Sequence, residues 1–119
     1  MKRILLGTVL AVALAAPAAA SSSITLVQSD PHFGGPATFT LIFPSKYGCS
    51  HGICKSHVRL DCYQAGNLVY EDSTGTDAPD FVLGGQQWTG GPADCTATLS
   101  YVDRRTDVTL ATTSFAVAG

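Results

Sequence analysis

Short runs in which apolar and polar residues alternate recur along the chain from residue 24 onward, with turns rich in glycine, proline and aspartate between them. In the run 95–101, Cys95, Ala97, Leu99 and Tyr101 share one face, and three hydroxyl residues share the other. A period of two is typical of a strand with one buried face. Similar runs predict six further strands, at 24–27, 37–44, 57–64, 68–71, 81–83 and 108–117.

No window of the chain carries apolar residues at helical spacing, and the strand-forming residues Thr, Val and Tyr are abundant. About seven short strands at steady spacing, separated by turns, predict an all-β fold. Among all-β architectures, we expect an immunoglobulin-like antiparallel β-sandwich rather than a barrel.

The first twenty residues have the pattern of a secretory signal peptide. A basic pair at Lys2 and Arg3 precedes an apolar run at 4–14, and small residues end at Ala20. A membrane anchor is the competing interpretation, but Pro17 interrupts the run before it reaches the roughly 20 apolar residues that a spanning helix needs. We therefore expect cleavage after Ala20, a secreted product, and one domain at 21–119.

The charge of the expected product argues against nucleic acid as a partner. The chain has seven Lys and Arg and nine Asp and Glu, so removal of Lys2 and Arg3 leaves a net charge of −4. Nucleic-acid binding relies on basic side chains that neutralise phosphates, and no basic stripe is present. After removal of the leader we also expect no membrane association.

Four cysteines allow three disulfide pairings. Cys62 and Cys95 fall on the apolar faces of two predicted strands and can meet in the core, whereas Cys49 and Cys54 share one predicted loop at 45–56. An oxidising compartment favours disulfides, so we expect the pairs 62–95 and 49–54. The pattern leaves open whether the 62–95 bridge crosses between sheets or joins neighbouring strands.

Zinc is a second interpretation of the loop. Cys49, His51, Cys54 and His57 lie within nine residues and carry ligand types that hold tetrahedral Zn²⁺. Structural zinc usually joins ligand pairs from two separate elements, and export favours oxidation of the thiols. We therefore favour the disulfide, and expect no metal and no cofactor.

The motifs of catalysis are weak, and we expect the protein not to be an enzyme. His32, His51 and His57 lie in or beside loops, and no G-x-S-x-G motif is present. Glu71 and Asp72 are adjacent, so on a strand they point to opposite faces and cannot act as paired carboxylates. The acidic segment 72–80 lacks the EF-hand spacing for Ca²⁺ and is interpreted as an ordinary turn.

Several segments resemble a known group of proteins, and together they cover nearly the whole expected product. The segments 62–70, 81–84 and 88–99, with the pattern Trp-x-Gly-Gly-x-Ala-x-Cys at 88–95, resemble small immunoglobulin-like proteins of actinobacteria and their bacteriophages. The resemblance implies the fold and the 62–95 pair but no activity. A likeness to the chromophore-carrying apoproteins of actinomycetes is at the level of the fold only.

Together these features predict an exported, non-catalytic domain that binds a protein or a cell-surface glycan. The expected contacts are Ser50, His51 and Ile53, since a closed loop loses little entropy on binding. Trp88 is a further expected contact, although a tryptophan is more commonly buried. The alternatives are a small-ligand carrier with an aromatic-lined cleft between the sheets, and a structural accessory protein of a phage particle.

Overall fold

The computed structural model describes residues 22–119, so the predicted leader lies outside the described residues. The described chain is built from antiparallel β-sheets, with one short 3-10 turn, η2, at Ser45–Tyr47. The strands are β1 (Ser23–Leu26), β2 (Pro36–Ile42), β3 (Cys49–Ser50), β4 (Ile53–Cys54), β5 (Ser56–Gln64), β6 (Asn67–Gly75), β7 (Asp80–Val82), β8 (Ala93–Asp103) and β9 (Thr106–Val117). The all-β expectation is confirmed.

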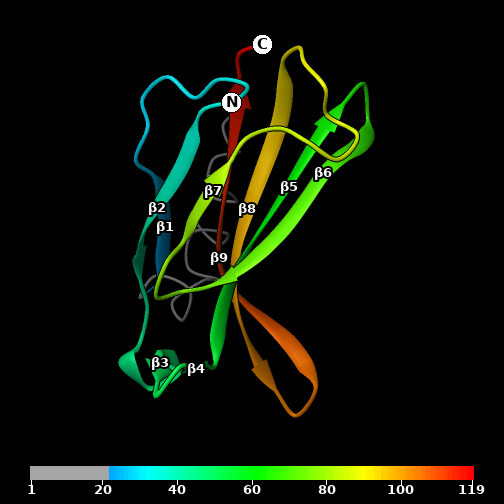
Figure 1. Ribbon diagram of the computed structural model, residues 1–119. Helices are drawn as coiled ribbons and strands as arrows, with labels where there is room; N and C mark the ends of the chain where they lie inside the picture. The colour runs from blue at the N-terminus through cyan, green and yellow to red at the C-terminus, as the bar shows by residue number, and fades with distance from the viewer. Residues whose placement is uncertain (1–21) are drawn as a thin grey trace, which may run out of the picture.

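Two larger sheets enclose the core (Figure 1). One has three strands in the order β1-β2-β7, and the other has four in the order β6-β5-β8-β9. Along β5, the inward positions Val58, Leu60 and Cys62 are fully buried and alternate with more exposed residues. The period of two in the sequence therefore marks the face of each sheet that packs on the core.

Trp88 lies in this core, and its prediction as a surface contact is wrong. Its side chain is 0% exposed, and its ring packs edge-on against Phe33 at 5.5 Å and Tyr70 at 6.2 Å. The indole N–H donates a hydrogen bond of 2.9 Å to the carbonyl of Gly91. The large apolar ring is therefore buried with its single donor satisfied, which is the more stable arrangement.

The structure joins Cys62 to Cys95 within one sheet. The two residues lie directly opposite each other on β5 and β8, with their Cα atoms 4.0 Å apart, and both are buried. The bridge therefore links neighbouring strands rather than the two sheets, which decides between the alternatives that the sequence left open.

The structure differs from the predicted pattern in three places. β6 continues to Gly75, because its polar half pairs with the first half of β5. The predicted loop at 45–56 contains η2 and the hairpin β3–β4. Near the end of β8, Ser100 is buried opposite His57 of β5, against the expected alternation, and β9 carries an extra residue, Leu110, between the partners of Leu99 and Ser100.

Candidate functional site: the hairpin end

A disulfide closes the hairpin β3–β4. Cys49 and Cys54 pair across it with Cα atoms 3.9 Å apart. The turn residues His51 and Gly52 have φ of 53° and 78°, and positive φ at both central residues is what a type I′ turn requires. We call residues 49–54 the stapled hairpin. Its tip, from Ser50 to Ile53, is exposed, so the structure brings the three predicted loop contacts together at the surface.

Hydrogen bonds anchor the stapled hairpin to the sheets. The buried Ser56 hydroxyl donates to the carbonyl of Tyr47 at 2.6 Å and contacts the Thr76 hydroxyl at 2.8 Å. The backbone N–H of Val102 on β8 donates to the carbonyl of Lys55 at 3.2 Å. These bonds tie η2, the start of β5, the segment after β6 and the end of β8 into one unit, so the tip is held on a fixed base.

Two tyrosines pack beside this base. The rings of Tyr47 in η2 and Tyr101 on β8 stack with centroids 3.9 Å apart and an interplanar angle of 14°. The Tyr101 hydroxyl lowers the pKa of Tyr47, and the nearby Lys46 acts in the same direction, because both stabilise the phenolate. Tyr47 in turn raises the pKa of Tyr101.

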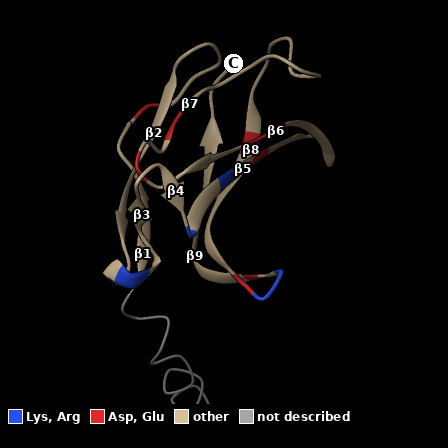
Figure 2. Ribbon diagram, turned by 60° about the horizontal axis from the view of Figure 1, so that its bottom comes forward, with Lys and Arg blue, Asp and Glu red and all other residues tan. Residues whose placement is uncertain are grey.

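The tip of the hairpin β8–β9 lies at the same end of the molecule as the stapled hairpin (Figure 1). Its two turn residues, Arg104 and Arg105, are exposed and have φ of 50° and 73°. Figure 2 shows basic positions at this tip, flanked by acidic ones. We call the surface made by η2, the stapled hairpin and this tip the hairpin end.

The structure does not bring together the four ligands of the zinc interpretation. The two cysteines are joined, and a disulfide offers no thiolate to a metal. His51 contacts the neighbouring Ser50 hydroxyl at 3.1 Å, whereas His57 lies on β5 beside Ser100. A carboxylate oxygen of Asp77 lies 3.7 Å from Cys54 Sγ, but a disulfide sulfur carries no proton to donate to it.

A serine, a histidine and an aspartate do meet elsewhere, which sequence reasoning missed. His57 Nε2 lies 3.1 Å from Ser100 Oγ and 3.8 Å from Asp107 Oδ1. In a catalytic triad the acid holds the other ring nitrogen, Nδ1, so this arrangement cannot orient the histidine as a base. The cluster forms because the pairing of β5 with β8 places His57 opposite Ser100. No local sequence motif indicates this pairing.

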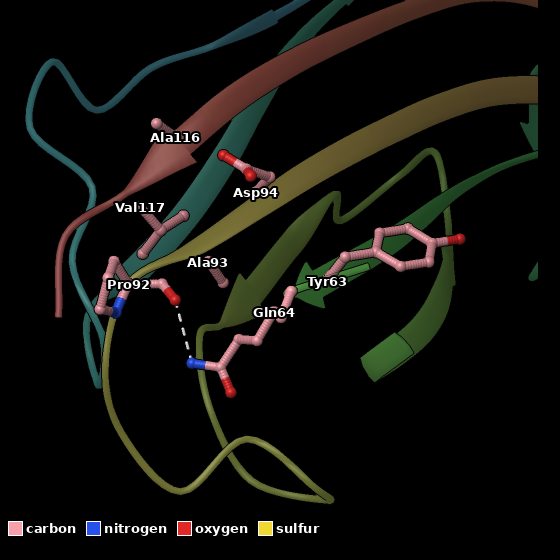
Figure 3. A pocket seen from close by; sticks show the side chains of 8 residues that line it. Tyr63, Gln64, Pro92, Ala93, Asp94, Ala116 and Val117 are labelled. Carbon is pink, nitrogen blue, oxygen red and sulfur yellow. Dashed lines mark hydrogen bonds between the residues drawn. The ribbon is translucent and has the colours of Figure 1, made fainter. Parts of the chain in front are cut away.

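A hollow of about 280 Å³ lies at the opposite end of the four-stranded sheet. Figure 3 shows the side chain of Gln64 reaching across to Pro92, while the ring of Tyr63 extends away. The Gln64 amide donates to the carbonyls of Gly90 and Pro92 at 2.8 and 2.9 Å. The hydrogen-bonding groups of this hollow thus hold the loop before β8 in place, which is a structural role.

Within residues 22–119, no helix has the length and apolar character needed to cross a membrane. The two disulfides fit a protein of an oxidising compartment. Comparisons with protein families, with curated proteins and with solved structures find no match to this chain. Any statement about its function therefore rests on its own residues and geometry.

Proposed function

We propose that this chain is an exported, non-catalytic immunoglobulin-like domain that binds a protein through the hairpin end. The sheet order supports the fold: the strand that follows β5 pairs with it, as the added strand does in the larger sheet of variable-type immunoglobulin domains. In such domains the connections at one end of the sandwich bind the ligand. The stapled hairpin and the β8–β9 tip are two connections at one end.

Ile53 carries this proposal. Its side chain is 72% exposed at the tip of the stapled hairpin, although solvent exposure of a large apolar group brings no gain in stability. The disulfide and the hydrogen bonds of Ser56 hold the tip in one conformation before any partner arrives. A rigid apolar anchor loses little entropy on binding and gains the full free energy of desolvation.

The residues around the tip favour a protein over a glycan. Tyr47, Tyr101, Arg104 and Arg105 lie at the same end, and tyrosine and arginine are enriched in protein–protein interfaces. Sugars pack on the flat face of an aromatic ring. The two tyrosine rings cover one face of each other and so leave less of that surface for a sugar.

The test compares two truncations of exposed apolar residues. Fluorescently labelled protein is titrated onto intact cells of the producing organism, with Ile53→Ala as the variant and Val27→Ala as the control. Val27 is 57% exposed but directly follows β1, outside the hairpin end. We expect Ile53→Ala to weaken binding about tenfold or more and Val27→Ala to leave it unchanged.

Pretreatment of the cells separates the two classes of partner. Protease should abolish binding, whereas binding that resists protease and is lost after periodate oxidation would assign a glycan instead. Equal affinity of the wild type and Ile53→Ala would contradict the role of the stapled hairpin.

A small-ligand carrier is the second candidate function. The observation that favours it is a groove of about 600 Å³ between β6 and β7, which belong to different sheets. Tyr70 and Phe81 contribute aromatic rings to it. Exported protein that carries a conjugated ligand should absorb light at wavelengths beyond the tyrosine and tryptophan bands.

A further inference from the structure

The groove between β6 and β7 has an apolar side. It is lined by Pro36, Thr38, Tyr70, Asp72, Asp80, Phe81, Val82 and Gly84. The rings of Tyr70 and Phe81 are almost fully buried, while Pro36 and Val82 remain exposed at its margin. An open groove of this size, with exposed aliphatic side chains at its margin, can hold the apolar body of a small organic molecule.

The charged side chains of the groove are acidic. Asp72 and Asp80 are both exposed and line it, and the Tyr70 hydroxyl donates to Asp72 Oδ2 at 3.4 Å. No lysine or arginine lines the groove. Two carboxylates beside an apolar wall produce a negative potential that attracts a cation.

The basic side chains of the described chain lie outside the groove, although Arg59 shares a neighbouring hollow with Asp72. Arg59 pairs with Asp61 and Glu71, on the outer face of the four-stranded sheet. The remaining basic residues of residues 22–119 lie in or beside the hairpin end, at Lys46, Lys55, Arg104 and Arg105. Among the described residues, the salt bridges include neither Asp72 nor Asp80.

The wall of the groove formed by β6 is held in place. The side-chain amide of Gln86 forms two hydrogen bonds with the backbone of Glu71, accepting from its N–H at 2.9 Å and donating to its carbonyl at 2.8 Å. The N–H of Gln87 donates to the carbonyl of Val69 at 3.0 Å. Residues 86–87 therefore pair with Val69–Glu71 in the manner of a short added strand. The groove opens beyond this pairing, at Asp72.

We propose that this groove binds a small organic cation, an ammonium or guanidinium group attached to an aromatic or aliphatic body. The charged group would lie between Asp72 and Asp80, and the body would pack on Val82 and the edges of Tyr70 and Phe81. The inference rests on the second candidate function and gives it a ligand class. It is independent of the hairpin end.

A matched pair of probes tests the charge requirement. Phenethylammonium and its neutral analogue 2-phenylethanol are titrated into the purified protein. Trp88 serves as the fluorescent reporter because it is the chain's single tryptophan and packs against Tyr70. We expect the cation to bind about tenfold or more tightly than the alcohol, and added salt to weaken it.

A matched pair of variants locates the site. Asp72→Asn with Asp80→Asn should weaken binding of the cation about tenfold or more, because it removes both carboxylates. Asp30→Asn with Asp94→Asn changes the net charge equally at exposed positions outside the groove and should have no effect. Thermal unfolding of both variants verifies that the fold is retained.

Three results would overturn the proposal: equal affinity for the two probes, equal loss in the two double variants, or no saturable signal at millimolar probe. Ile53→Ala should leave this titration unchanged. A failure here therefore leaves the protein-binding function of the hairpin end intact.

Discussion

At the scale of single residues, burial decides what each aromatic side chain does. Trp88 and Tyr70 pack edge-on in the core, whereas Tyr47 and Tyr101 stack on each other near the surface. Each of the four has at least one polar or small neighbour in the sequence, so the local pattern alone does not separate these roles. The packing of Tyr70 has a consequence for stability at high pH.

Tyr70 should make folding less favourable as the pH rises from about 10 to about 12. Its side chain is 5% exposed, and burial, with the charge and hydrogen bond of Asp72, raises its pKa to about 12 from 10.0. Between these values the unfolded chain loses the proton while the folded protein keeps it. Deprotonation therefore favours the unfolded state.

The measurement is urea unfolding of the wild type and Tyr70→Phe at pH 9 and pH 11.5. The wild type should lose about 2 kcal/mol more of its unfolding free energy than the variant over this range, since each pKa unit corresponds to about 1.4 kcal/mol. An identical loss in both proteins would show that Tyr70 ionises as it does in the unfolded chain. Other tyrosines contribute equally to both measurements.

At the scale of elements, three strand-to-strand hairpins of the described residues are closed by tight turns with different chemistry. Positive φ occurs at both central residues in Ala65-Gly66, His51-Gly52 and Arg104-Arg105. The first two place glycine, which adopts this conformation without steric cost, at the second position. The third uses two arginines, so the β8–β9 tip is the strained turn of the three.

Replacing Arg104-Arg105 by Asn-Gly should stabilise the protein by about 0.5–1 kcal/mol, because Asn-Gly is the preferred pair for this turn. Chemical denaturation measures the change in unfolding free energy. The reverse control, Gly66→Ala at the β5–β6 turn, should destabilise by about 1 kcal/mol or more, because Gly66 has a positive φ. A loss of stability in the Asn-Gly variant would mean that the arginine side chains contribute more than the turn strain costs.

If the hairpin end is the binding surface, the Asn-Gly variant should also bind its partner less well. The arginines would then be retained for recognition despite their cost in stability. Residues that lower stability but strengthen binding are expected at a functional site.

At the scale of the whole molecule, the small size of the domain makes covalent bonds important. About 100 residues enclose a modest core, and each disulfide removes conformational freedom from the unfolded chain. One bridge lies inside the four-stranded sheet and the other closes the stapled hairpin. Both need an oxidising compartment to form, which connects the fold to the predicted leader.

We expect the exported protein to begin at Ser21 and to contain no free thiol. Intact mass spectrometry after alkylation under denaturing conditions measures both properties, with a fully reduced and alkylated sample as the control. Retention of the first twenty residues would contradict cleavage. Alkylation of two thiols that map to Cys49 and Cys54 would contradict the disulfide of the stapled hairpin. A metal adduct in a mass spectrum recorded under native conditions would then favour the zinc interpretation of this loop.

Much of the architecture follows from local pattern in the sequence. The alternation in 57–64 and 95–101 marks strands with one buried face, because that period suits a pleated strand. The spacing of Cys49 and Cys54, in a segment rich in turn residues, indicates a small ring. The exposed position of Ser50, His51 and Ile53 is expected from the same segment, because connecting segments usually run over the protein surface.

Other features depend on which strands become neighbours, and only the tertiary structure decides them. Pairing of β5 with β8 places Cys62 opposite Cys95 within one sheet and brings His57 to Ser100. The fold also buries Trp88, stacks Tyr47 on Tyr101 and opens the groove at Asp72 and Asp80. A period of two tells which face of a strand is apolar. It carries no information on which strand lies alongside, because that choice depends on contacts between residues far apart in the chain.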